Sequence, residues 1–150
     1  MFQHHGTTRL IPPGASNPVD IDNDMVPLVQ QLWAMGLTTM ACCQDNGQAV
    51  EAERGENRKT EPTGHHGFIE YHRGWAWLKM PVPDTLALLS VLSEHEVFAS
   101  RTQVRWQRGS WRIHIPVIHD NTEFRPAPYA QIYFPRTQIT ELTTALKAPT

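Results

Sequence analysis

Short runs that alternate between two kinds of side chain indicate a sheet in this chain. Residues 104–115 alternate in this way, and the runs Trp75 to Met80 (WAWLKM) and Tyr129 to Phe134 (YAQIYF) are also expected to be strands. A period of two is typical of a strand that buries one face. Because short turns separate most of these runs, we expect hairpins and a mostly antiparallel sheet.

Helical spacing of apolar residues recurs in three segments, at 25–35, 84–92 and 137–147. The first is followed by Gly36, a residue type that commonly ends helices, and Asp84 is expected to cap the second. Combined with the strands, these segments predict an α+β fold. Its mostly antiparallel sheet would have about three helices packed on one side.

A length of 150 residues fits one domain. We expect a polar N-terminal arm over residues 1–18, as an ordered loop or a frayed end, and a single α+β domain over 19–150. A charged stretch over 44–66 has no apolar stripe and is expected to be a loop insertion. The segments 75–92 and 132–146 share the order strand, proline, helix, so the sequence leaves open a fold of two related halves.

The remaining elements rest on shorter patterns. The β-rich segments 37–43 and 67–71 are expected to be strands, the second leading into a hairpin turn at 72–74. Residues 104–115 alternate around a glycine-containing turn, which predicts another hairpin. Residues 119–128 are expected to form a loop.

Charge and cysteine content limit the partners and the cellular location that we expect for this chain. The formal net charge is −2, without the basic excess typical of nucleic-acid binders, so nucleic acid is not an expected partner. No apolar stretch has the length of a membrane span, and we expect no membrane contact. Adjacent Cys42 and Cys43 are poorly placed to form a disulfide with each other. With no secretory signal visible, a cytoplasmic location is expected, and homo-oligomerisation is left open.

The polar segment that follows the 37–43 strand is the first candidate site. It combines a hydroxyl, a thiol, two amides and a carboxylate in Thr39, Cys43, Gln44, Asp45 and Asn46. A strand end that opens into a loop is a common place for ligand contacts, and these groups suit a ribose, a base edge or a phosphate. The alternative is structural, with a buried cysteine followed by a turn.

Four further residues complete the predicted ligand-binding set: His66, Glu70, Arg105 and Arg112. Arginines recognise anionic groups, and nearby tryptophans offer surfaces on which a base can stack. Solvated strand edges and core tryptophans explain the same pattern without a ligand. Because the histidines and cysteines lack the usual spacing of metal motifs, we predict no metal site and no cofactor.

A resemblance adds to this interpretation. The pattern of Asp20, Pro27-Leu28, Leu32-Trp33, Gly36 and Thr39 with Cys43-Gln44-Asp45 resembles uncharacterised small proteins of phages, prophages and actinobacteria. More distantly, it is similar to the wybutosine-synthesis methyltransferase family. That family has Ser-Gly-Arg after the cysteine, whereas this chain has Gln44-Asp45-Asn46. The resemblance implies a fold more than an activity.

Three functions remain open at this point. The first is a phage-type protein that binds a small, nucleotide-like molecule and sequesters a signalling nucleotide. The second is an enzyme, methyltransferase-like or hydrolytic, that acts on a nucleotide or nucleic acid through Cys43, Asp45 and His66. The third is a protein-interaction module that uses the charged insertion as its contact arm. No residue is assigned a catalytic role.

Overall fold

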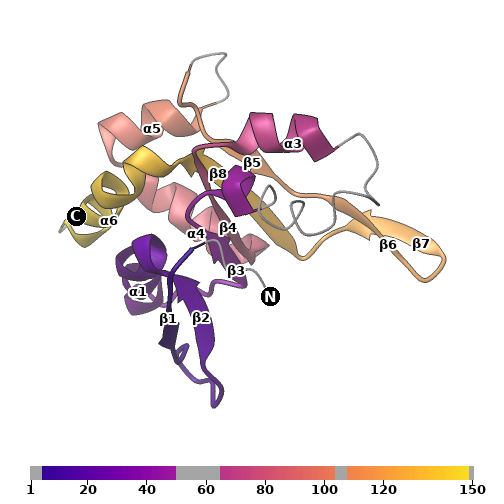
Figure 1. The fold of residues 1–150 in the computed structure, drawn as a ribbon, viewed down its shortest axis with the longest axis horizontal. Helices are drawn as coiled ribbons and strands as arrows, with labels where there is room; N and C mark the ends of the chain where they lie inside the picture. Colours follow the sequence, from indigo (N-terminus) through magenta and orange to yellow (C-terminus); the bar gives the residue numbers. More distant parts are fainter. Residues whose placement is uncertain (1–4, 50–64, 104–107, 149–150) are drawn as a thin grey trace.

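A central antiparallel sheet organises the protein (Figure 1). The computed structural model describes residues 5–49, 65–103 and 108–148. Within these ranges the sheet has four strands, in the spatial order β3 (Ala41–Cys43), β4 (Trp75–Pro81), β8 (Tyr129–Pro135) and β5 (Arg112–His114). Every neighbouring pair is antiparallel, which confirms the α+β class and the mostly antiparallel sheet.

The two central strands give the sheet a buried face and an open face. β4 and β8 are each seven residues long, and both alternate between half-buried and buried positions. Side chains alternate across a strand, so the buried positions form one face. They are Ala76, Leu78, Met80, Ala130, Ile132 and Phe134. Both segments were predicted to be strands, and the structure confirms this.

Helices cover the buried face. α1 (Val26–Ala34), α4 (Val82–Leu92) and α6 (Ile139–Lys147) contribute apolar side chains to one core with the sheet, and all three were predicted. α5 (Glu96–Thr102), which was not predicted, adds Phe98 to that core. The described part of the chain therefore has more helices than the three expected. No helix in that part has the length and apolarity needed to cross a membrane.

The strand–proline–helix segments become neighbours in space. β4 and β8 pair in a register that runs from Trp75 opposite Pro135 to Pro81 opposite Tyr129. β4 then leads into α4, and β8 leads through a 3-10 turn, η2 (Arg136–Gln138), into α6. The two segments thus lie antiparallel around the middle of the sheet. Asp84 makes no side-chain cap on α4, and its Oδ2 accepts a bond from the Thr38 amide at 2.8 Å.

The N-terminal segment is more ordered than an arm. β1 (Thr7–Leu10) pairs with β2 (Val19–Asp22), and a 3-10 turn, η1 (Asn23–Met25), connects β2 to α1. The expectation of a loop or frayed end over residues 1–18 is therefore wrong for β1. Most of the hairpin is solvated, so its sequence has little of the apolar periodicity that would predict a strand. β3 is also shorter than the strand predicted over 37–43.

The predicted strand at 67–71 is a helix. α3 (His65–His72) covers one end of the open face, and the expected hairpin turn at 72–74 instead joins α3 to β4. The buried residues Ile69 and His72 lie three positions apart, which is one helical turn. The aromatic and β-branched residues of this segment favour a strand, but in the folded protein packing against the sheet stabilises a helix.

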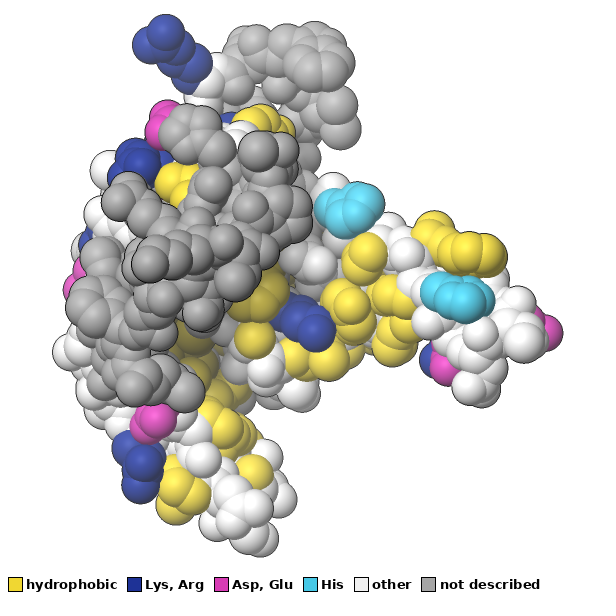
Figure 2. Space-filling model, turned by 45° about the vertical axis from the view of Figure 1, so that its right-hand side comes forward, with side chains coloured by type: hydrophobic (Ala, Val, Ile, Leu, Met, Phe, Trp, Pro, Cys, Tyr) yellow, Lys and Arg dark blue, Asp and Glu magenta, His cyan; other side chains and the backbone are white. Residues whose placement is uncertain are grey.

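The segment after β5 is also different from the prediction. β6 (Val117–Asp120) and β7 (Glu123–Pro126) form a hairpin where a loop was expected. Asn121 in its turn has a positive φ of 56°, a conformation that asparagine tolerates. Figure 2 shows this hairpin as an arm extending from the body of the molecule. Of the hairpin predicted over 104–115, residues 104–107 lie outside the described part, and β5 pairs with β8.

Candidate functional site

Polar and aromatic side chains line the open face of the sheet. The register places Cys43 opposite Trp77, Trp77 opposite Tyr133, and Tyr133 opposite Arg112, in one row across four strands. The next row on the same face is Ala41, Lys79, Gln131 and His114. Lysine and arginine lie in these rows, and neither row contains a carboxylate.

Arg112 differs from the other arginines in its partners. Its guanidinium lies between the rings of Tyr71 and Trp75, at 3.6 and 3.7 Å from their centroids. Its Nη1 donates to the Tyr71 carbonyl oxygen at 2.6 Å. Among the described residues it makes no ion pair, whereas Arg101 and Arg136 both bind carboxylates. Burial lowers the pKa of Arg112, but a guanidinium stays charged at neutral pH.

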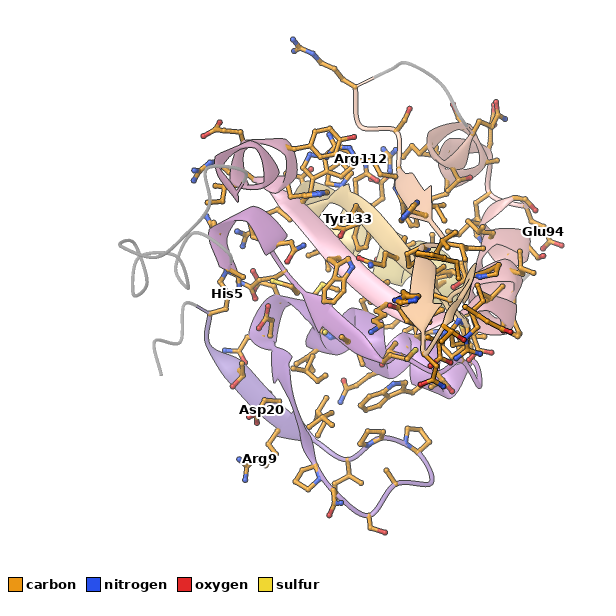
Figure 3. All side chains as sticks on the ribbon, turned by 90° about the vertical axis from the view of Figure 1, so that its right-hand side faces the viewer. His5, Arg9, Asp20, Glu94, Arg112 and Tyr133 are labelled. Atoms are coloured by element: carbon orange, nitrogen blue, oxygen red, sulfur yellow. The ribbon has the colours of Figure 1, made fainter. Side chains whose placement is uncertain are left out.

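A cavity of about 470 Å³ opens beside this guanidinium. Figure 3 shows Arg112 and Tyr133 close together, beside α3. The volume lies within the range of small-molecule sites. The cavity is lined by Tyr71, His72, Arg112, Ile113, His114, Gln131 and Tyr133.

The cavity walls are held by ring stacking and shared hydrogen bonds. The His72 ring stacks on Tyr133 at 4.2 Å. Burial, with a smaller effect of the Arg112 charge, lowers the pKa of His72 to about 4, so this ring is neutral at pH 7. Gln131 Oε1 accepts bonds from Tyr133 Oη at 2.9 Å and Trp77 Nε1 at 3.2 Å. The amide oxygen of Gln131 is thereby oriented, and its NH₂ group is left as a donor.

The predicted segment from Thr39 to Asn46 makes mainly structural contacts. Thr39 Oγ1 accepts the Trp33 indole N–H at 3.0 Å. Gln44 Oε1 accepts the amide of Asp24 at 3.1 Å, which satisfies a donor in η1. Asn46 is the first residue of a helical turn at 46–49. These polar groups bind the protein's own backbone and side chains.

Asp45 joins three parts of the chain. Its side chain is almost fully buried, with Oδ1 accepting the Gln48 amide at 3.0 Å. Oδ2 accepts the Gly74 amide at 3.0 Å and Nη1 of Arg136 at 3.3 Å. The carboxylate therefore caps the 46–49 turn and connects it to the residues that precede β4 and follow β8.

The remaining predicted residues do not converge on one site. Cys43 lies at the opposite end of its row from Arg112 and faces the N-terminal segment. Glu70 is exposed and lies 3.8 Å from Arg73. The side chain of His66 and all of Arg105 lie outside the described part of the structure. Burial raises the pKa of both Cys42 and Cys43 to about 12, so the thiols are protonated at neutral pH.

The predicted ligand-binding set contains one residue of the cavity, Arg112, and misses the other six: Tyr71, His72, Ile113, His114, Gln131 and Tyr133. The alternation in 129–134 puts Gln131 and Tyr133 on the face opposite the core, and this signal could have found them. Tyr71 and His72 were assigned to a strand and its turn, which hid their approach to Arg112. The chain matches no protein-family model, no curated protein and no solved structure at a significant level.

Proposed function

We propose that this protein binds a small, planar, anionic molecule of the nucleotide type in the cavity between α3 and the open face of the sheet. The observation that carries the proposal is Arg112. Its charge is held at the cavity by two aromatic rings, and no carboxylate among the described residues neutralises it. An anionic ligand can supply that missing partner.

The other cavity residues support the same ligand chemistry. Gln131 offers an amide donor, and Tyr133 a hydroxyl, to the polar edge of a ring. Lys79 adds a second cation on this face, 4.0 Å above the Tyr129 ring. A neutral His72 contributes a flat wall without adding charge. Binding to this face would accord with sequestration of a signalling nucleotide, the first of the three functions that the sequence leaves open.

The enzyme alternative has weaker support. A hydrolytic or transferase site at Cys43 needs a thiolate, and a pKa of about 12 leaves very little of it at neutral pH. Asp45 is occupied by three donors and is not available as a general base. The observations favour binding without a reaction at the cysteine.

Calorimetric titration with a panel of nucleotides tests this proposal. Linear mono- and diphosphates, cyclic nucleotides and the parent nucleosides should separate the contribution of the phosphate from that of the ring. Arg112→Gln should weaken the tightest ligand by roughly tenfold or more, the usual value of a bond to a charged group. Arg125→Gln is the matched control, because it removes the same charge from the exposed β6–β7 hairpin.

The outcomes are distinct. Equal binding by wild type and Arg112→Gln, or no binding by any nucleotide at millimolar concentration, would overturn the proposal. Chromatography of the ligand recovered after incubation should return it intact. A converted ligand would instead favour the enzyme.

A further inference from the structure

Three side chains of types that bind metals meet at the β3 edge of the sheet, at the opposite end of the Cys43–Arg112 row from the cavity. Nδ1 of His5 lies 3.1 Å from Oδ2 of Asp22 and 3.9 Å from Sγ of Cys43. One ligand atom from each residue falls within 4.8 Å of the other two. The side chains of His5 and Asp22 are only 7% and 15% exposed, and Cys43 is buried. They come from before β1, the end of β2 and the end of β3.

Both ring nitrogens of His5 face oxygen atoms. On one side, Nε2 lies 3.3 Å from Oε1 of Gln48, and that oxygen also accepts from Arg136 at 3.4 Å. The amide is thereby oriented, so Nε2 carries a hydrogen. On the other side, Nδ1 faces the carboxylate oxygen of Asp22, which is an acceptor as well. A neutral ring has one N–H and cannot donate to both oxygens, whereas a metal cation between Nδ1 and Asp22 satisfies the second contact.

We infer that His5, Asp22 and Cys43 form a Zn²⁺ site that fastens the N-terminal hairpin to the edge of the sheet. Imidazole, thiolate and carboxylate are the ligands that zinc takes in proteins, whereas Mg²⁺ and Ca²⁺ prefer oxygen alone. Ligand atoms around a tetrahedral zinc lie about 3.2–3.7 Å apart, given bonds of about 2.0–2.3 Å. The contacts at 3.1 and 3.9 Å are close to that spacing.

Surrounding groups already hold two of the three ligands in place. Gln48 binds the far nitrogen of the His5 ring, and the Gln44 amide donates to Oδ2 of Asp22 at 2.9 Å. Such contacts are typical of metal sites, where they fix the orientation of the ligands. On binding, a Zn–S bond forms, the S–H bond of Cys43 breaks, and its proton leaves to solvent. No oxidation or reduction is involved. A water molecule would complete the tetrahedron.

This site is separate from the proposed ligand cavity. Figure 3 shows His5 at the N-terminal side of the sheet, well apart from Arg112 and Tyr133. The three ligands join the segment before β1 to the ends of β2 and β3. Zinc would therefore act on the stability of the N-terminal hairpin, because metal binding and folding are coupled in such sites.

Adjacent cysteines provide a matched pair of variants. Cys43 faces the cluster, whereas Cys42 packs against the core on the other face of β3. Untagged full-length protein is stripped with a chelator, and Zn²⁺ alone is then titrated against a competing zinc indicator. We expect one zinc per wild-type chain and a rise in the melting temperature. Cys42→Ala should keep both, and Cys43→Ala should bind zinc at least 100-fold more weakly with no thermal response.

His5→Ala provides a second test that does not remove a buried side chain from the sheet. It should lose zinc binding like Cys43→Ala, and it keeps the proposal testable if that variant fails to fold. Co²⁺ in the wild-type protein should give a thiolate charge-transfer band that Cys42→Ala retains and His5→Ala loses. Zinc bound equally by Cys42→Ala, Cys43→Ala and His5→Ala, or a folded wild type that takes up no zinc, would overturn the inference.

Discussion

The carboxylate of Asp45 is buried and shared by the amides of Gln48 and Gly74 and the guanidinium of Arg136. Asp45→Ala should therefore leave the amides of Gln48 and Gly74 without their acceptor, while Arg136 keeps its bonds to Asp24 and Gln48. We expect a loss of about 3 kcal/mol in the free energy of unfolding, since each unsatisfied buried donor costs about 1–3 kcal/mol. Chemical denaturation measures this directly.

Asp20→Ala is the control for that measurement. Asp20 pairs with Arg9 at 3.4 Å on the surface, where ion pairs contribute less than about 1 kcal/mol. If Asp45→Ala were no more destabilising than Asp20→Ala, and also abolished ligand binding, Asp45 would be a ligand contact and its structural interpretation would be wrong.

Gly47 is required by the close approach of two backbones. A Cβ added there would lie 2.5 Å from the amide nitrogen of Arg73, closer than packed atoms tolerate. Gly47→Ala should push the 46–49 turn away from the end of α3 and lower the stability by about 2 kcal/mol.

The same substitution at Gly67 should have the opposite effect on stability. Gly67 lies inside α3, and an added Cβ meets nothing within 4 Å. Alanine is the better helix former, so stability should rise by up to about 1 kcal/mol. Thermal melts of the two variants compare them directly, and a destabilised Gly67→Ala together with an unchanged Gly47→Ala would contradict the packing described here.

The sequence can identify polar residues that lie close together along the chain. The segment from Cys43 to Asn46 does form part of a dense polar network, but its composition says nothing about which partners occupy it. The partners of Asp45 and Cys43 come from Arg136 and His5, which are distant in sequence. Only folding brings them together, so the division between structural and ligand-binding groups was beyond a single sequence. The ligand-binding roles remain predictions.

At the scale of elements, the docking of α3 depends on the protonation of His72. The pKa of about 4 in the folded protein is below the ordinary value of 6.5, because burial and Arg112 disfavour the imidazolium. The unfolded chain binds the proton first as the pH falls. The contribution of His72 to stability should therefore be complete above about pH 6.5 and decline as the pH falls toward 4.

His72→Phe tests this pH dependence. Phenylalanine keeps a ring on Tyr133 and does not titrate, so the loss of stability between pH 7.5 and pH 5 should be smaller in the variant than in wild type. Urea denaturation at the two pH values gives the comparison. His114→Phe, at an exposed position on β5, should keep the wild-type pH dependence. Identical pH profiles for wild type and His72→Phe would show that α3 does not depend on this residue.

Elements with one fully buried face were predictable, and the others were not. β4, β8, α1, α4 and α6 each carry a regular apolar period, because burial selects the side chains on one face. α3 covers the sheet with a short, mixed surface and was assigned to a strand. β6 and β7 have little buried surface to impose alternation and were assigned to a loop. The local sequence pattern therefore predicts an element only where packing against the core determines which of its residues are apolar.

At the scale of the whole molecule, the fold is a sheet-centred body with two outlying hairpins. The body contains the shared core of α1, α4, α5 and α6 with the sheet. β1–β2 joins it through Ile21 and Leu10, which pack with the core, and through the polar network around His5 and Asp22. β6–β7 pairs only with itself among the described strands. The body should therefore fold independently of β6–β7, whereas β1–β2 is coupled to it.

Excision of the β6–β7 hairpin tests that division. The Ala127 amide donates to the Pro116 carbonyl at 2.8 Å, so the two ends of the hairpin already lie side by side. Replacing 117–126 with Asn-Gly supplies a turn that suits this spacing. The hairpin leaves Val117 and Phe124 exposed by 66% and 77%, so its removal uncovers little apolar core.

We expect a soluble protein with a melting temperature within about 4 °C of wild type, a shift of roughly 1 kcal/mol at this size. Binding at Arg112 should persist, because the cavity takes no residue from the hairpin. An unfolded product would mean that β6–β7 supports the sheet. A folded product that lost nucleotide binding would place the ligand against the arm as well as in the cavity.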